Sequence, residues 1–216
     1  TQHKLVYVPS LAKDILEQIS FEARDSEYVD NKSGVSARMS ITAFENLMST
    51  AEHRALKSGT EKTTLRLSDF IGIIPAITGK VELVYEGEQE GAAFVAQNLI
   101  GSAIKTLFPT LLPKIEKLEK PDAKTPYSDL IEWFFAESGF ELLDDVSDEE
   151  YKKILDEVTP LDIIVKKYQP QLDKNDQYFF KEFILWGLVE YKKLSKDRFA
   201  TGHQFKDMYG SYISKL

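Results

Sequence analysis

The chain has 216 residues, 43% hydrophobic and 29% charged, which excludes a disordered, collagen-like or disulfide-scaffold protein and fits one large or two small folded domains. Cysteine is absent, so disulfides, thiolate metal sites and thiol nucleophiles are excluded, and we expect a reducing, cytoplasmic compartment. A net charge of -8 repels nucleic acid and anionic membrane surfaces, and no apolar stretch is long enough to span a bilayer, so we expect neither partner.

The chain begins Thr1-Gln2-His3-Lys4, with neither an initiating Met nor the apolar region of a signal peptide, and runs directly into apolar residues. We therefore expect it to be an excised part of a longer protein.

The first half is predicted to be helical. Pro9-Ser10 begins a helix that should run to about Arg24, and the polar stretch 25–34 ends it. Ser36 is the expected N-cap of a second helix. Its apolar stripe comprises Ile41, Phe44, Leu47, Met48, Ala51, Ala55 and Leu56. Further along, we expect a helix over 68–77, a short strand or hairpin near 80–85, an acidic turn over Glu86 to Gly91, and an apolar helix over 92–108.

Lysines and prolines between Lys114 and Pro126 predict a boundary, with domains at 1–113 and 114–216. The second domain should also be helical. Helices are expected over 127–138, over 151–158 with Ser147 and Glu150 as a capping box, over 160–168, after the cap Asp173, and finally over about 202–213.

Few residues suggest chemistry. Gly79-Lys80 lacks the earlier glycine of a phosphate-binding loop and is interpreted as a helix-end turn. The histidines His3, His53 and His203 lack metal-ligand spacing, so we expect them at the surface and predict no metal site. The carboxylates Glu86, Glu88 and Glu90 could bind a cation or transfer protons, but a solvated loop is the preferred interpretation.

Arg38 is the exception, because it lies in the first turn of a helix whose N-terminus carries the same sign of charge. Such a pair could hold a phosphate. From the residues alone, pairing of Arg38 with an acid such as Asp30 is the favoured alternative.

The run from Ser33 to Leu47, SGVSARMSITAFENL, resembles the sensor-2 helix of AAA+ ATPases of the MoxR and magnesium-chelatase I-subunit group. The resemblance extends through AEHRAL (51–56), LSDF (67–70), IPAITGK (74–80) and YEGEQEG (85–91), covering about the first hundred residues. It reverses the preference at Arg38, because the sensor-2 arginine of such proteins reaches toward the γ-phosphate of ATP.

The resemblance implies an all-α chain made of a helical AAA+ lid subdomain followed by a helical C-terminal extension. The full-length protein would be an ATP hydrolase that binds ATP and Mg, forms a homo-oligomeric ring and acts on a protein substrate or partner. The missing ATPase core should lie upstream of Thr1. Arg38 would be the one nucleotide-binding residue here, with no catalytic residue and negligible ATP affinity for the fragment alone.

An alternative is a free-standing helical adaptor that binds a partner protein through aromatic residues of the second half. These are Trp133, Phe134, Phe135, Phe179, Phe180 and Trp186. Burial in the core is their default interpretation.

Overall fold

A computed structural model describes residues 5–30, 32, 35–116, 124–137, 140–199 and 201–208. The chain divides into two compact units, Thr1–Leu107 and Phe108–Leu216, so the division falls six residues before the boundary expected at 113/114. The difference arises because one continuous helix, α5, contributes residues to both units. Residues 117–123 of the expected boundary segment lie outside the described residues.

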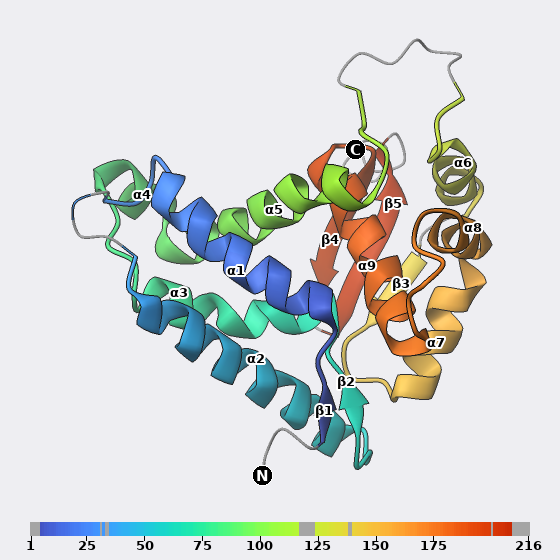
Figure 1. The fold of residues 1–216 in the computed structure, drawn as a ribbon, viewed down its shortest axis with the longest axis horizontal. Helices are drawn as coiled ribbons and strands as arrows, with labels where there is room; N and C mark the ends of the chain where they lie inside the picture. The colour runs from blue at the N-terminus through green and yellow to red at the C-terminus, as the bar shows by residue number, and fades with distance from the viewer. Residues whose placement is uncertain are drawn as a thin grey trace. The chain divides into compact units, whose positions relative to one another are not determined.

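Unit 1 is mainly helical, with one short pair of parallel strands, β1 and β2 (Figure 1). Its elements in chain order are β1 (Val6–Tyr7), α1 (Ser10–Asp25), α2 (Ala37–Lys57), β2 (Thr63–Thr64), the 3-10 helix η2 (Leu67–Ile73), α3 (Ile74–Thr78), α4 (Tyr85–Glu90) and α5 (Ala92–Leu111).

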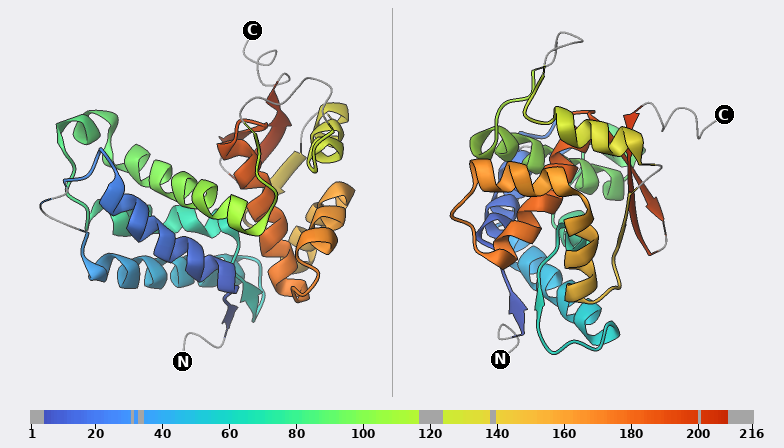
Figure 2. Two further views of the ribbon diagram at one scale, coloured as in Figure 1. Left: turned by 45° about the horizontal axis from the view of Figure 1, so that its top comes forward. Right: turned by 90° about the vertical axis from the view of Figure 1, so that its right-hand side faces the viewer.

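Helices α1 and α2 lie side by side, and their apolar faces form much of the unit 1 core (Figures 1 and 2). The bounds of α1 and the start of α2 agree with the sequence expectation. Ser36 caps α2 by accepting a hydrogen bond from the Arg38 backbone N–H at 3.2 Å. The expected apolar stripe of α2 is buried at Leu47, but Ile41 is 62% exposed and Leu56 78% exposed. The helical period therefore predicted the face of α2 correctly but overestimated its width.

A buried ion pair fixes α2 against η2. The Arg54 guanidinium donates to both carboxylate oxygens of Asp69, at 3.0 and 2.8 Å, and to the Thr63 hydroxyl at 2.8 Å. Asp69 also accepts from the backbone N–H of Arg66 at 2.8 Å. Because the charges are paired and hydrogen-bonded, their burial is tolerated.

The segment 80–91 differs from expectation in two ways. No strand forms at 80–85; instead Leu83 makes an isolated bridge with Val29, and α4 begins at Tyr85. The predicted acidic turn Glu86–Gly91 is wrong, because residues 85–90 are the helix α4, and only Gly91, with φ of 93°, leaves the helical conformation. Gly87 is needed for packing rather than for a turn: a Cβ there would lie 2.5 Å from the Tyr28 carbonyl oxygen.

Unit 2 combines helices with a three-stranded antiparallel sheet in the order β3-β5-β4. Besides the end of α5, its elements are α6 (Ser128–Ala136), β3 (Phe140–Leu143), α7 (Asp148–Glu157), α8 (Thr159–Tyr168), α9 (Lys174–Glu190), β4 (Leu194–Phe199) and β5 (Gly202–Asp207). The Ser147 hydroxyl caps α7 and the Asp173 carboxylate caps α9, as the sequence predicted.

The sheet corrects the all-α expectation: the protein is mostly helical with a few short strands. The final helix expected over 202–213 is wrong at its start, because 202–207 is strand β5; residues 209–213 lie outside the described part of the chain. The sequence did not predict strands β4 and β5. Lys196, Arg198 and His203 lie on the face of the strands that carries the buried Phe205, so the usual alternation of apolar and polar residues is absent.

Among the described residues, no helix combines the length and apolarity needed to cross a membrane.

Candidate functional site

Arg38 stands at the N-terminal end of the 21-residue helix α2. Its side chain is exposed, and within the described residues its guanidinium makes no hydrogen bond or ion pair. The alternative pairing with Asp30 is therefore not formed. Asp30 instead accepts from the backbone N–H of Lys32 at 2.8 Å.

The electrostatics at this helix end favour an anion. The first turn of α2 holds no acidic residue, so the partial positive charge of the helix N-terminus adds to that of Arg38. An exposed guanidinium can donate two hydrogen bonds to one phosphate. Arg38 and one helix end are nevertheless an incomplete phosphate site. The other groups that bind the phosphate would have to come from residues other than those at the start of α2. Ser33 and Gly34, which precede the cap, lie outside the described residues.

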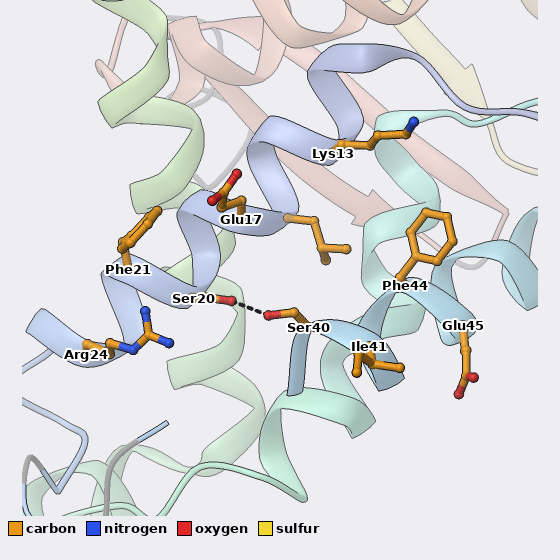
Figure 3. Close-up of a pocket in the computed structure, with 10 residues that line it drawn as sticks. Lys13, Glu17, Ser20, Phe21, Arg24, Ser40, Ile41, Phe44 and Glu45 are labelled. Carbon is orange, nitrogen blue, oxygen red and sulfur yellow. Dashed lines mark hydrogen bonds between the residues drawn. The ribbon is translucent and has the colours of Figure 1, made fainter. Parts of the chain in front are cut away.

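A groove of about 650 Å³ lies between α1 and α2; we call it the α1–α2 groove (Figure 3). The hydroxyls of Ser20 and Ser40 are 2.7 Å apart and join the two helices along it. Its apolar part includes Phe21 and Ile41, both substantially exposed. Its lining is Lys13, Leu16, Glu17, Ser20, Phe21, Arg24, Ser40, Ile41, Phe44 and Glu45.

The α1–α2 groove suits binding rather than catalysis. Figure 3 shows Lys13 and Arg24 well separated along α1, with Glu17 between them and Glu45 on α2, so the charges of its rim alternate in sign. Its lining has no histidine, and its two serine hydroxyls bond to each other rather than to a base. Arg38 is not among its lining residues, so the predicted site residue and the groove are separate features of α2.

The other residues singled out by the sequence do not assemble into a site. Gly79 ends α3 by donating its N–H to the Pro75 carbonyl oxygen, as expected of a helix-end turn. The carboxylates Glu86, Glu88 and Glu90 are exposed on α4. Among the described residues, no group of three histidine or acidic side chains is arranged to hold a metal ion.

The histidine prediction is wrong at one position. His53 is exposed on α2, as expected, but His203 is only 1% exposed, between strand β4 and helix α9. His3 lies outside the described residues.

The aromatic residues of the second half are mainly core. Phe134, Phe179, Phe180 and Trp186 are buried, whereas Phe135 is 71% exposed. Four rings of α6 and the sheet meet edge to face or tilted, with centroids 5.0 to 6.4 Å apart. These contacts explain most of the aromatic composition by packing. Of the predicted set, Trp133 is half-buried and Phe135 is the most exposed.

The sequence did not anticipate a cluster of ionisable side chains on the inner face of the sheet. Lys196 of β4 places its ammonium nitrogen 3.0 Å from the centroid of the Trp186 ring, and burial lowers the pKa of Lys196 to about 8. Arg198 and His203 lie beside it. No period of apolar residues in LSKDRF or GHQFKD could have found the strands, because Lys196, Arg198 and His203 share a face with the apolar Leu194 and Phe205.

Comparisons with known proteins identify no relative: no family model, curated protein or solved structure matches the chain.

Proposed function

We propose that this chain is the lid and C-terminal extension of a AAA+ ATPase of the MoxR and magnesium-chelatase I-subunit-like group, with Arg38 as its sensor-2 arginine. The proposal rests on the resemblance of residues 33–91 to that group, and above all on the motif around Arg38. The guanidinium of Arg38 is exposed at the start of α2 and has no hydrogen-bond or ion-pair partner among the described residues, which supports the proposal.

In this proposal, the ATPase core and the lid would share one nucleotide. Bound ATP, with Mg, would supply the phosphate whose transfer to water drives the cycle. Arg38 would donate hydrogen bonds to the terminal phosphate from the lid side, and the positive end of α2 would add to its attraction. Loss of that phosphate would remove the partner of Arg38, so the lid could move relative to the core.

The first test is the coding sequence upstream of Thr1. We expect it to encode a phosphate-binding loop, GxxxxGK[ST], between a strand and a helix, followed by an acidic Walker B strand. A stop codon or a start site directly before Thr1 would contradict the proposal and leave the adaptor, with Phe135 as its accessible aromatic residue, as the better account.

The second test is the Arg38→Ala substitution in the longer protein. A hydrogen bond to a charged group contributes about 1.5–3 kcal/mol, so kcat/KM for ATP hydrolysis should fall by about tenfold to a hundredfold. Lys57→Ala is the matched control, because Lys57 is an exposed cation at the opposite end of the same helix. If the Arg38 variant and the wild type have equal ATPase rates and form oligomers equally, Arg38 does not have the sensor-2 role.

A further inference from the structure

Three ionisable side chains join the three strands of the unit 2 sheet on its inner face. His203 lies on β5, Arg198 is its directly opposed partner on β4, and Asp144 immediately follows β3. The Arg198 Nη1 atom is 3.1 Å from His203 Nε2, and its Nη2 atom is 3.3 Å from Asp144 Oδ2. The His203 Nδ1 atom is 3.6 Å from Asp144 Oδ1. We call these three residues the sheet triad.

The geometry of the sheet triad fixes the protonation of the imidazole. A guanidinium has five N–H donors and no acceptor, so His203 Nε2 must accept the hydrogen bond from Arg198. The ring is then neutral, with its proton on Nδ1, the nitrogen that faces Asp144. At 3.6 Å the Nδ1 to Oδ1 contact is longer than a hydrogen bond, so Asp144 acts on His203 mainly as a nearby charge.

The surroundings of His203 contain charges of both signs. From β4 come the cations Lys196 and Arg198, and from the end of β3 comes Asp144. Helix α9 contributes the ring of Trp186, centred 5.4 Å from the imidazole, and its Glu182 and Glu190 act on Lys196. Helix α6, which also packs against β5, contributes the rings of Trp133 and Phe134 around Phe140 of β3. Burial lowers the pKa of His203; Asp144 opposes this, while Lys196 and Arg198 add to it.

We propose that His203 is a proton-sensitive clasp of the unit 2 sheet. In the neutral state it accepts from Arg198 and so ties β5 to β4, while Arg198 ties both to Asp144 after β3. A proton gained at Nε2 turns that atom into a donor facing a guanidinium, so the Arg198 contact is lost and the β4–β5 hairpin loosens.

The sign of the pH dependence follows from the folded and unfolded states. The pKa of His203 is lower in the folded chain than the ordinary value of about 6.5, so the unfolded chain binds more protons between the two values. The stability supplied by the neutral ring is complete above about pH 6.5 and is lost as the pH falls through that window. One extra proton in the unfolded state raises the equilibrium constant for unfolding by up to about tenfold per pH unit.

Ring-nitrogen NMR of the whole chain tests the clasp directly. In long-range ¹H–¹⁵N spectra between pH 8 and 5, we expect His203 to carry its proton on Nδ1 and to titrate below pH 6.5. The exposed His53 gives a reference ring in the same sample. A proton on Nε2 at pH 7.5, or a charged His203 ring at pH 7, would overturn the proposal.

Stability measurements test its consequence. Guanidinium unfolding at intervals between pH 8 and 5 should show the wild type losing stability more steeply below pH 6.5 than His203→Gln, by up to about tenfold in the unfolding constant per pH unit. Glutamine can offer Arg198 an acceptor that does not titrate. His53→Gln, the control, should follow the wild type. Parallel profiles of the wild type and His203→Gln would refute the clasp, and if His203→Gln does not fold, the NMR titration of the wild type still decides.

Discussion

In unit 1, the carboxylate of Asp69 is the clearest case of one side chain that binds several groups, because it pairs with the Arg54 guanidinium. Both side chains are at least 95% buried, and Asp69 also accepts from the Arg66 backbone N–H. Asp69→Ala would leave the Arg54 guanidinium buried without its counter-charge. We expect a loss of about 3–5 kcal/mol in the free energy of unfolding, measured by denaturant titration with circular dichroism.

An exposed pair in unit 2 provides the control. Lys124 and Asp129 are 3.3 Å apart, with both side chains more than half exposed. Water screens such a pair, so Asp129→Ala should cost no more than about 1 kcal/mol. If the Asp69 and Asp129 variants lose similar amounts of unfolding free energy, then burial does not determine how much an ion pair contributes to stability.

At the residue scale, the sequence predicts what local chemistry determines. Ser36, Ser147 and Asp173 cap their helices as expected, because a cap depends on a side chain and the backbone two or three residues away. The burial of His203 was missed, because it depends on strands and a helix far apart in the chain. The role of Arg38 stays a prediction, because its ligand and the rest of its site are not in the described residues.

Helix α9 shows at the element scale how one glycine permits close packing. A Cβ at Gly187 would lie 2.1 Å from Phe108 Cδ2. The Phe108 ring cannot simply move aside, because it is buried and packs against the rings of Tyr127, Phe183 and Tyr191, with centroids 5.5 to 5.8 Å away.

Gly187→Ala should therefore destabilise unit 2, although alanine is by itself the better helix former by about 1 kcal/mol. We expect overpacking to lower the free energy of unfolding by about 1–3 kcal/mol. Tryptophan fluorescence during guanidinium unfolding measures this loss. Phe108→Leu in the same chain should recover part of that loss, giving a coupling energy in a double-mutant cycle. A more stable Gly187→Ala variant would show that the contact with Phe108 does not restrict this position.

The elements that the sequence assigned correctly are those with a wide apolar face or a strong cap, such as α1, α2 and α9. The elements it missed have neither. Strands β4 and β5 carry Lys196, Arg198 and His203 on the face that packs toward the core. Helix α4 contains three glutamates and a glycine, a composition that resembles a turn. The first turn of α4 tolerates Glu86 and Glu88 because acidic side chains interact favourably with a helix N-terminus.

At the scale of the whole molecule, the two units have separate sets of core residues, and the fluorescent probes are distributed unevenly between them. Both tryptophans, Trp133 and Trp186, belong to unit 2, whereas unit 1 has none. Tryptophan fluorescence therefore reports on unit 2 alone, and far-ultraviolet circular dichroism reports on the helices of both units. A substitution confined to the core of unit 1 can then be followed by circular dichroism, while tryptophan fluorescence reports on the unchanged unit 2.

If each unit folds as its own cooperative domain, the two probes should separate in the variants. Asp69→Ala should lower the denaturant midpoint of the main change in circular dichroism while the fluorescence midpoint stays within error. Gly187→Ala should move the fluorescence midpoint, since Phe108, Gly187 and both tryptophans belong to the same unit. Equal shifts of both probes in both variants would instead mean that the helix α5, which contributes to both cores, couples them into one unfolding transition.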